Sequence, residues 1–484
     1  MSLPQYKLNL LSAKGTFMHL SPLTKVACAM ALILTTSDTM SAVETQPANT
    51  SVPEGEMRYK VSAFPDRVAL IATASPARSQ TFSWRTQVMS EPALLQITAA
   101  TPSPGLHLKA TEYSAEHVRL TSANGKAQHH RVTVDGLTPD TLYAYRVSGD
   151  GTWSDWYQFR TPAATFSPYT ALYFGDAQNA VYSHFSRTVR ESLRTAPRAK
   201  VMLYAGDLVN SRDGIHDDEW GEWFAAVDWM AATVNQLPAA GNHEFSSDDD
   251  NPIRHLLPNW TAHYPVAGNG PDALSDTVYF SDVQGVRYIA LDSTEALQDE
   301  AHAKRQAEWL QNVLADNPNR WTVVFHHHPI QSVSKGRDNP PLRKYWQPIY
   351  EQFDVDFVLQ GHDHTYGRHS QLSDHSGPVY VVSVAGPKMY LVSDEAQRVM
   401  HRTAEDTQLF QTLAFSEQQV AYRSYTATGE LYDAFILHKR ADGSKRLTDQ
   451  VPDTAERRCQ NPAPARDDRC WNGTDVIYAQ PIKK

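Results

Sequence analysis

The sequence has few cysteines, no apolar run long enough to cross a membrane and no excess of positive charge. Three of the 484 residues are cysteine, and the formal net charge at pH 7 is −10. Proteins that bind nucleic acid usually present a basic patch, so this charge balance argues against that class. It argues only weakly against anionic small molecules as substrates, because bound metal ions can reverse the sign of a site locally.

The apolar run near the N-terminus is too short to span a bilayer, which takes about 20 residues. It covers Val26–Leu34, follows Lys14 and Lys25, and is succeeded by small residues at 37–42. This order of charged, apolar and small regions is typical of an export signal, although a buried helix is the alternative. We therefore expect residues 1–42 to be a signal peptide, with Met18 as an alternative start, and the protein to be periplasmic or secreted, with no membrane span in its mature form.

The three cysteines fall into two groups. Cys28 lies inside the expected signal peptide, whereas Cys459 and Cys470 flank a proline-rich loop near the C-terminus. In an exported protein two such cysteines most simply form a disulfide, and two free thiols are the alternative. A metal site is disfavoured there, because no histidine lies between or beside them.

The region from 43 to 162 divides into a linker and an all-β unit. Residues 43–56 are polar, contain proline and lack periodicity, which predicts a disordered linker. From 57 to 162 short alternating runs are separated by turn residues, as in a β-sandwich. Within it Leu137–Val147 is similar to the tyrosine corner of such domains, with Tyr143 bonding back to the chain, and Trp84 is expected in the core.

A different pattern begins after Pro162. Apolar runs that each end in polar groups alternate with helix-like stretches, which predicts an α/β domain over 163–450 with strands covered on both faces. The runs are Tyr169–Asp176, Lys200–Asp207, Trp321–Pro329 and Asp356–His364, and the clearest helix is Ala301–Asp316. Ser393–Phe410 is expected to be a surface helix or long loop, and Glu430–Leu447 a strand pair. Residues 451–484 form a tail that the disulfide would cap.

Polar side chains follow these runs where each predicted strand ends. In chain order they are Asp176, Asp207, Asn242, His243, His327, His362 and His364. The intervals are 31 residues from Asp176 to Asp207, 35 from Asp207 to Asn242 and 35 from His327 to His362. Each interval fits one β-α-β unit, so these groups can lie side by side at neighbouring strand ends.

Carboxylates, imidazoles and an amide oxygen suit divalent ions such as zinc, iron or manganese. Two such ions would share one ligand, for which an aspartate with two oxygens is suited, and would lie about 3.5–4 Å apart. Each short motif alone has an ordinary explanation, such as a turn or a helix cap. The complete set in this order predicts a metal site.

The blocks GDAQ, GDLVN, GNHE, VVFHHHP and GHDH resemble the calcineurin-like metallophosphoesterase pattern. They resemble more closely the purple acid phosphatase family, whose members carry an N-terminal fibronectin type III-like domain. The resemblance covers nearly everything after the linker. It implies an all-β sandwich followed by an α/β domain layered α/β/β/α, two divalent metal ions (iron, zinc or manganese) and a small phosphoester substrate.

The resemblance also implies roles for individual residues. The first metal would be held by Asp176, Asp207 and His364, and the second by Asp207 as the bridge with Asn242, His327 and His362. Metal-activated water would attack phosphorus, and His243 would protonate the leaving alkoxide. Within the histidine triplet the family spacing selects His327 as the ligand, so His326 is expected to face packing and His328 the mouth of the site.

Asn210 departs from the family pattern, which has a tyrosine three residues after the bridging aspartate. An amide oxygen could coordinate, so Asn210 is a further ligand candidate, but it supplies no phenolate for a ferric ion. We therefore expect two divalent ions and no purple colour. Histidines that plant members carry after the VxxH block are also missing. His328, Lys335, Arg337 and Arg343 are the candidates for contact with the substrate phosphate, with solvated surface charge as the alternative for the last three.

The sequence thus predicts an exported dinuclear metal-dependent phosphoesterase, most simply a phosphomonoesterase. A phosphodiesterase acting on nucleotides or lipid headgroups is an alternative, because the same metals can serve a different pocket. A non-catalytic surface binding or adhesion protein is the alternative from a different class, with the β domain recognising a ligand.

Overall fold

The structure is a computed structural model that describes residues 50–53, 55–246, 253–370, 377–460, 462 and 467–470. The expected signal peptide, residues 1–42, lies outside the described residues, as do residues 43–49 of the expected linker. Thr50 and Ser51 of that linker donate hydrogen bonds to the Glu222 carboxylate, and Val52 is buried. This short part of the linker is therefore ordered against the α/β region rather than disordered, because the buried Glu222 carboxylate accepts its hydrogen bonds.

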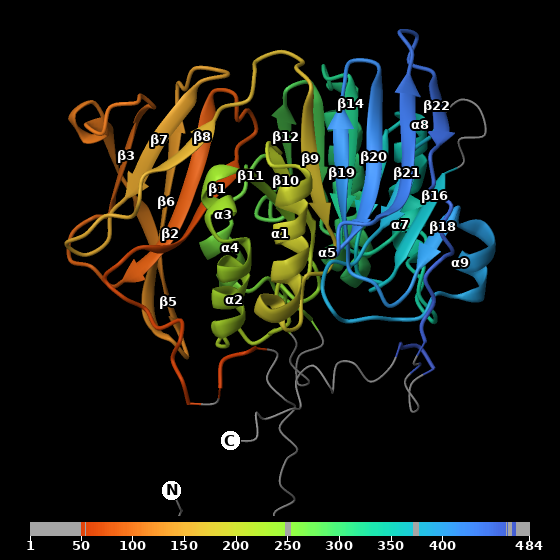
Figure 1. The fold of residues 1–484 in the computed structure, drawn as a ribbon, viewed down its shortest axis with the longest axis horizontal. Helices are drawn as coiled ribbons and strands as arrows, with labels where there is room; N and C mark the ends of the chain where they lie inside the picture. The colour runs from red at the N-terminus through yellow and green to blue at the C-terminus, as the bar shows by residue number, and fades with distance from the viewer. Residues whose placement is uncertain are drawn as a thin grey trace, which may run out of the picture. The chain divides into compact units, whose positions relative to one another are not determined.

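The N-terminal region is a sandwich of two antiparallel layers, seen in orange at the left of Figure 1. One layer has the order β1-β2-β6-β5 and the other β4-β3-β7-β8. The strands are β1 (Asp66–Ala72), β2 (Ser79–Gln87), β3 (Leu94–Ala99), β4 (Thr111–Ser114), β5 (Glu116–Ser122), β6 (Gly125–Asp135), β7 (Leu142–Val147) and β8 (Tyr157–Arg160), with a 3₁₀ turn at Leu106–Leu108. Their inward-facing apolar residues form one core between the layers. The predicted all-β region is confirmed.

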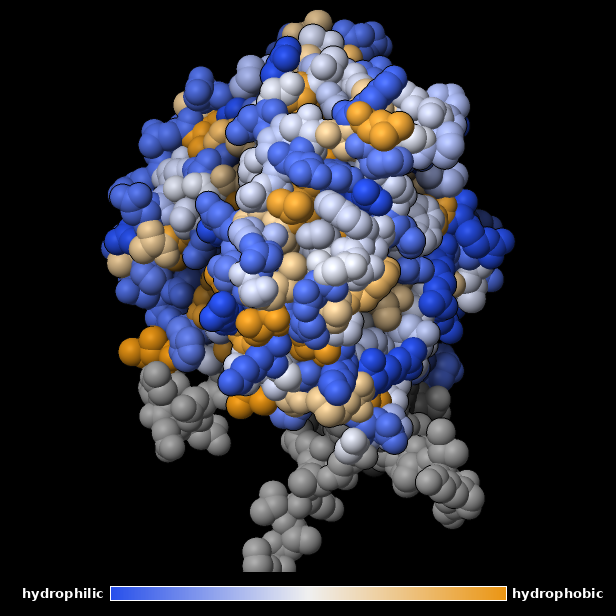
Figure 2. Space-filling view, turned by 90° about the vertical axis from the view of Figure 1, so that its left-hand side faces the viewer, coloured by the Kyte–Doolittle hydropathy of each residue, from blue (hydrophilic) through white to orange (hydrophobic). Residues whose placement is uncertain are grey.

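Two details of this sandwich match the sequence-based expectations. The backbone N–H of Thr138 donates to the Tyr143 phenol oxygen at 2.9 Å, which is the expected tyrosine corner. Trp84 is 1% exposed in the core, and its indole N–H donates to the Ser148 carbonyl at 3.0 Å. On the face of the molecule formed by this region, apolar residues lie in small groups separated by polar ones (Figure 2).

The α/β region is built on two further groups of strands. One group extends the sheet of β1 in the order β22-β21-β20-β19-β9-β10-β11, and the other is a separate sheet in the order β12-β13-β14-β15-β17-β16-β18. The strands are β9 (Tyr169–Phe174), β10 (Val201–Ala205), β11 (Asn235–Ala239), β12 (Tyr279–Val283), β13 (Val286–Ala290), β14 (Trp321–His326), β15 (Phe357–Gln360), β16 (Tyr366–Ser370), β17 (Val379–Val382), β18 (Arg402–Ala404), β19 (Leu409–Phe415), β20 (Gln419–Thr426), β21 (Leu431–Lys439) and β22 (Lys445–Asp449). Strands β9, β10 and β11 are parallel, as are β13, β14, β15 and β17.

The two sheets pack face to face and helices cover their outer faces, which confirms the α/β/β/α layering. Apolar side chains of β9–β11 meet those of β13–β15 in a dry core between the sheets. Helices α1 (Ser186–Thr195), α2 (Asp218–Val227), α3 (Trp229–Thr233) and α4 (Pro258–His263) pack on the first sheet, with a π-helical turn at Val181–Phe185. Helices α5 (Ser293–Gln298), α6 (Glu300–Ala315), α7 (Pro340–Tyr345) and α8 (Gln347–Gln352) cover the second. Figure 1 shows α1 and α2 in front of the first sheet.

The sandwich and the α/β region share a sheet rather than meeting only through a linker. Strand β1 runs parallel to β11, with Ile71 opposite Gln236, so the joint sheet has eleven strands in the described part of the chain. The predicted boundary at residue 162 is therefore crossed by continuous strand pairing.

The C-terminal part contains the expected strand pair and disulfide. Strands β21 and β22 form a hairpin around residues 442–443, and Cys459 is bonded to Cys470. The stretch 393–410 contains helix α9 (Asp394–Val399), strand β18 and the start of β19. No helix among the described residues is long and apolar enough to cross a membrane.

Candidate metal centre

The predicted ligand residues converge at the carboxyl ends of strands from both sheets of the α/β region. Three of them follow β9, β10 and β11 of the shared sheet: Asp176, Asp207 and Asn242. The others follow β14 and β15 of the second sheet: His327, His362 and His364. Because parallel strands end at the same edge of a sheet, the two packed sheets bring all six groups to one place.

Asp207 lies at the centre of this group. One of its carboxylate oxygens is 3.2 Å from Nε2 of His327 and accepts a 2.7 Å hydrogen bond from the Gln178 amide. Asp176 lies beside it, with one oxygen 3.8 Å from Nε2 of His364. The ligand atoms of Asp176, Asp207 and His327 all lie within 4.8 Å of one another. Such spacing allows a cation to contact several of them at once.

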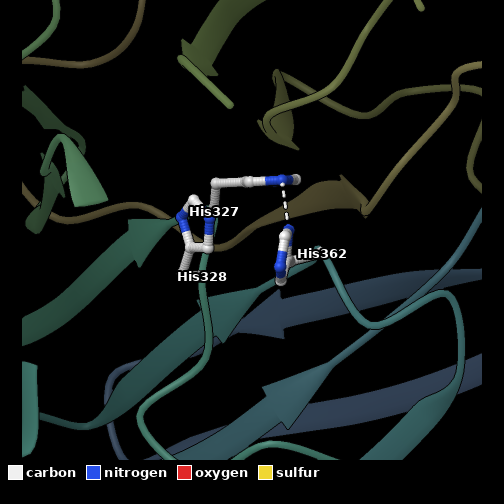
Figure 3. A group of neighbouring side chains, drawn as sticks. All are labelled: His327, His328 and His362. Carbon is white, nitrogen blue, oxygen red and sulfur yellow. Dashed lines mark hydrogen bonds between the residues drawn. The ribbon is translucent and has the colours of Figure 1, made fainter. Parts of the chain in front are cut away.

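A second group consists of His327, His328 and His362, whose ligand atoms also lie within 4.8 Å of one another. Figure 3 shows His327 reaching from the end of β14 towards His362, with its Nε2 3.1 Å from Nδ1 of His362. His327 thus belongs to both groups.

Hydrogen bonds behind the site orient two of these side chains. Nδ1 of His327 donates to the Ala205 carbonyl at 2.8 Å, which leaves Nε2 as the ligand atom, 3.2 Å from Oδ1 of Asn242. Glu244 accepts hydrogen bonds from the backbone N–H groups of Asp207, Leu208 and Gly241, at 2.9, 2.9 and 2.7 Å. The Glu244 carboxylate therefore connects, through hydrogen bonds, the turn that follows β10 to the turn that follows β11.

The backbone at the ligands is strained. Four of them have positive φ: Asp176 at 31°, Asp207 at 53°, His362 at 71° and His364 at 50°. Residues other than glycine rarely adopt such angles, and clusters of them are found mostly at functional sites. Gly241 has a steric role instead, because a Cβ there would lie 2.3 Å from Oδ1 of Asp207.

Burial and mutual charge shift the pKa values of the ligands. Burial raises the pKa of Asp176 to about 8, against the effect of His327, and the Asp207 carboxylate adds to the rise. Burial alone would lower the pKa of His327, but Asp207 and then Asp176 raise it to about 9. Two adjacent buried carboxylates favour a nearby positive charge, which is the electrostatic condition that a metal ion meets.

The residues present fit metal ions. In the described part of the chain, the buried side-chain polar atoms without a hydrogen-bond partner include three at this centre: Oδ1 of Asp176, Nδ1 of His364 and Oε1 of Gln178. Unpaired buried polar atoms are costly unless a ligand, ion or water satisfies them. Together with the mixed carboxylate and imidazole donors, they make a site that suits borderline divalent ions.

His243, the expected proton donor, lies at the edge of this group. Its Nδ1 donates to the Asn210 carbonyl at 2.6 Å, and its Nε2 is 2.8 Å from the Arg212 guanidinium. Since Arg212 can only donate, Nε2 of His243 accepts in this arrangement. Burial lowers the pKa of His243 to about 3, although Asp207 acts in the opposite direction.

The remaining sequence-based candidates lie in different surroundings. His328 is buried, and its Nδ1 lies 2.9 Å from the Ser293 hydroxyl. Arg337 donates to the His362 carbonyl and so borders the centre. Arg343 instead pairs with Asp338 and donates to the Ile330 carbonyl, and Lys335 is exposed.

Asn210 contributes its backbone to the site. Its carbonyl accepts from His243, and its N–H donates to the Glu219 carboxylate at 2.5 Å.

Three further residues that the sequence patterns did not single out also border the centre: Arg212, Lys388 and Tyr390. The Tyr390 ring packs against His364 in a tilted arrangement, with ring centroids 4.9 Å apart. Lys388 and Tyr390 follow β17 in the stretch VAGPKMY, another apolar run that ends in glycine and polar residues. The rule that located the other strand ends could therefore have found them.

Comparison with known families agrees with this geometry. The model described as "Purple acid Phosphatase, N-terminal domain" matches residues 65–161, and the model described as "Calcineurin-like phosphoesterase" matches residues 169–366. Together they cover more than half of the chain. The chain belongs to the purple acid phosphatase-like calcineurin-type phosphoesterases. In this family the expected N-terminal sandwich and layered α/β domain occur together.

Relatives within this group of phosphoesterases are distant. An uncharacterized protein of Mycobacterium tuberculosis is 28% identical over 282 residues, which are 52% of this chain and 52% of that protein. The Fe(3+)-Zn(2+) purple acid phosphatase 12 of Arabidopsis thaliana is 25% identical over 303 residues, 55% of this chain and 61% of that protein. The chain thus spans about half the length of the first and somewhat more of the second.

A solved structure of a purple acid phosphatase from yellow lupin seeds shares the fold. It aligns with a TM-score of 0.64 at 17% identity, over 78% of this chain and 75% of the lupin chain. This likeness supports the fold, in which an N-terminal β-sandwich precedes a layered α/β region.

Proposed function

We propose that the protein is a metal-dependent phosphoric ester hydrolase, most simply a phosphomonoesterase, with two divalent ions in its centre. The observation that carries this proposal is that two groups of possible ligand atoms meet at His327, whose Nε2 lies 3.2 Å from the Asp207 carboxylate. Asp176, Asp207 and His364 would hold one ion, and Asp207, Asn242, His327 and His362 the other. The similarity to the Fe(3+)-Zn(2+) purple acid phosphatase 12 of Arabidopsis thaliana supports a centre that holds two metal ions.

Bound metal ions supply Lewis-acid activation of water and neutralise the charge on phosphoryl oxygens. The chain's own residues would orient the reactants. His327 keeps Nε2 towards the ions because Ala205 holds Nδ1, and Gln178 fixes one oxygen of Asp207. On the leaving-group side, His243 would donate a proton once Nε2 is protonated and Arg212 has moved aside.

The donor set limits which metal ions the centre can hold. Iron, zinc and manganese all accept carboxylate and imidazole ligands. The Arabidopsis relative is named as an Fe(3+)-Zn(2+) enzyme, but Asn210 here supplies no phenolate. We therefore propose two divalent ions and no visible charge-transfer band.

We also propose that the protein is exported to the periplasm or secreted. The disulfide between Cys459 and Cys470 supports an oxidising compartment, and the N-terminal sequence pattern supports a cleaved signal. Cell fractionation with mass determination of the mature N-terminus tests this. A cytoplasmic protein that retains residues 1–42 would contradict it.

The function is tested on protein purified without added ions. Metal analysis should give two ions per chain, and hydrolysis of p-nitrophenyl phosphate should exceed that of bis(p-nitrophenyl) phosphate and stop with a chelator. Preference for the diester would favour the phosphodiesterase alternative. Stoichiometric metal without hydrolysis of either ester would favour a non-catalytic binding protein.

A further inference from the structure

A cluster of cations surrounds Tyr390 beside the metal centre. The guanidinium carbons of Arg337 and Arg469 lie 4.7 and 4.8 Å from the centre of the Tyr390 ring, and the Lys388 ammonium lies 5.7 Å from it. Tyr390 itself packs on His364, one of the candidate ligands. We call Arg337, Lys388, Tyr390 and Arg469 the Tyr390 cluster.

The positive charge of this cluster is only partly balanced by carboxylates. Arg337 lies 3.4 Å from Asp363 and Arg469 lies 3.7 Å from Asp468. Among the described residues, no carboxylate lies within ion-pair distance of Lys388.

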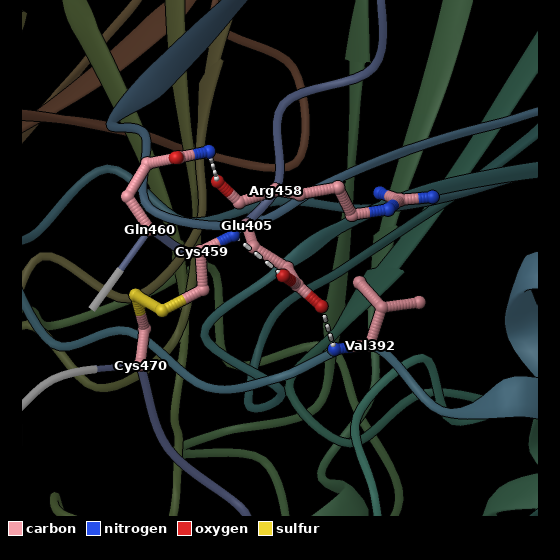
Figure 4. The surroundings of a disulfide bond; sticks show 6 residues. All are labelled: Val392, Glu405, Arg458, Cys459, Gln460 and Cys470. Atoms are coloured by element: carbon pink, nitrogen blue, oxygen red, sulfur yellow. Dashed lines mark hydrogen bonds between the residues drawn. A yellow bond between two sulfur atoms is a disulfide. The ribbon is translucent and has the colours of Figure 1, made fainter. Parts of the chain in front are cut away.

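The disulfide-bonded tail positions one member of the cluster. Figure 4 shows the Glu405 carboxylate between the backbone N–H groups of Val392 and Cys459, with hydrogen bonds of 2.7 and 2.8 Å. The backbone of Cys470 donates to the Met389 carbonyl at 3.3 Å.

These contacts fix the tail next to the loop that carries Tyr390. Arg469, the residue before Cys470, pairs as a β-bridge with Tyr390 and donates to its phenol oxygen at 3.1 Å. The tail is therefore part of the wall of the site.

We propose that the Tyr390 cluster is an anion subsite that binds a second phosphoryl group of the substrate. This inference rests on the proposed function, because the metal centre would hold the phosphoryl group that is cleaved. Three cations from three separate segments surround Tyr390, which packs against His364. Arg337 and Arg469 can each present two N–H groups to phosphoryl oxygens, and Lys388 adds a point charge.

This subsite would select among phosphomonoesters. Substrates whose leaving group carries a second phosphoryl group would bind through both sites, whereas esters of neutral alcohols would use the metal centre alone. The disulfide would then contribute to selectivity, since it holds the segment that supplies Arg469.

The test compares two probes on the metal-loaded full chain by isothermal titration calorimetry. Propane-1,3-diphosphonate carries two phosphonate groups, and propylphosphonate carries one. We expect the wild type to bind the diphosphonate at least about 10-fold more tightly, because a charge-assisted contact is worth about that factor.

The variants Arg469→Gln and Lys388→Gln should each lose about 10-fold in diphosphonate affinity and less than about 2-fold in propylphosphonate affinity. They lie on different segments, so a folding defect in one leaves the other informative. Arg194→Gln is the matched control, since this arginine is exposed on α1 and paired with Glu191 at 3.0 Å. It should change neither affinity.

A double change of Cys459 and Cys470 to serine should reproduce the selective loss of diphosphonate affinity. Equal losses for both probes, or an unchanged affinity ratio in Arg469→Gln and Lys388→Gln, would overturn the proposal. Hydrolysis of p-nitrophenyl phosphate is measured in parallel. If the wild type does not hydrolyse p-nitrophenyl phosphate but still binds the diphosphonate more tightly than propylphosphonate, the proposed hydrolase function is wrong. The proposed anion subsite would still be supported.

Discussion

At the scale of single residues, Asp207 is the side chain on which the proposed centre depends most. Its oxygens contact Gln178 and the backbone N–H of His243 and lie near Nε2 of His327. Asp207→Asn keeps one acceptor oxygen but removes the charge and the second anionic donor. We expect most of the bound metal to be lost, as measured by inductively coupled plasma mass spectrometry.

Asp442→Asn serves as the control for that measurement, because Asp442 lies on the exposed turn between β21 and β22. It should retain the wild-type metal content. Retention of both ions in Asp207→Asn would contradict the shared-ligand assignment.

His243 allows a second prediction at this scale. Its alanine variant should keep its metal but lose roughly 100-fold in kcat on esters of poor leaving groups, and much less on p-nitrophenyl phosphate, because an activated leaving group needs no proton. Steady-state kinetics over a series of leaving groups measures this. A uniform loss over the series would argue against proton donation.

A substitution at Asn210 tests the prediction that the protein lacks a visible absorption band because no tyrosine occupies this position. The N–H and C=O of this residue are held by Glu219 and His243, so a tyrosine can occupy the position without losing these backbone contacts. Asn210→Tyr loaded with iron should gain an absorption band in the visible range. A colourless product, with iron content shown to be equal to that of the wild type, would mean that position 210 does not face an ion.

At the scale of elements, the turns that end the strands determine the geometry of the centre. An alanine Cβ at Gly241 would lie 2.3 Å from Oδ1 and 2.4 Å from the backbone N of Asp207. Gly241→Ala should therefore displace the carboxylate and lower metal content, as measured by metal analysis, with a smaller effect on Tm.

Gly105→Ala is a control in which the new Cβ meets the flexible end of Leu108 at 3.3 Å. We expect it to leave metal content unchanged. Equal metal content in Gly241→Ala and the wild type would show that the turn after β11 can shift without moving Asp207.

The strand ends were predictable from sequence, whereas the approach of Arg337 and Arg469 to Tyr390 was not. Strands β9, β10, β14 and β15 each appear as a short apolar run that stops at glycine, aspartate or histidine, and this pattern is local. The cations around Tyr390 come from three distant segments, and arginine or lysine in a loop is most often solvated. Only the packing of the disulfide-bonded tail against the loop after β17 brings Arg469 to Lys388.

Sequence patterns also missed the sharing of a sheet between the two regions. The pairing of Ile71 with Gln236 joins strands that are far apart in the chain, and single-sequence periodicity gives the faces of a strand but not its neighbours.

At the scale of the whole molecule, a buried ion-pair cluster joins the sandwich to the α/β region. Asp217, just before α2, accepts hydrogen bonds from Arg67 of β1 at 2.6 Å and from Arg85 of β2 at 2.8 Å. All three side chains are almost completely buried. Asp217→Ala leaves the buried Arg67 without a carboxylate partner and leaves Arg85 with Asp66 alone, which should cost about 3–5 kcal/mol in the free energy of unfolding.

Urea unfolding measures this loss, with Glu116→Ala as the control. Glu116 pairs with Arg131 on the exposed face of the same sheet, and its removal should cost at most about 1 kcal/mol. Similar small losses for both variants would mean that the two regions do not depend on the Asp217 cluster.

The same cluster predicts the sign of a pH effect. Burial alone would raise the pKa of Asp217, but Arg67 and Arg85 hold it below its ordinary value. The stability contributed by this carboxylate is therefore fully present above about pH 4, the unfolded pKa, and is lost as the pH falls through the lower folded pKa. The Tm difference between wild type and Asp217→Ala should shrink below about pH 4, as measured by scanning calorimetry.

The joint sheet has a consequence for how this chain can be divided. A fragment starting after residue 162 would leave β11 without β1, and the bared N–H and C=O groups would be open to pairing with strands of other molecules. Recombinant fragments that begin there would tend to aggregate, because the sandwich normally covers the edge of the sheet in the α/β region.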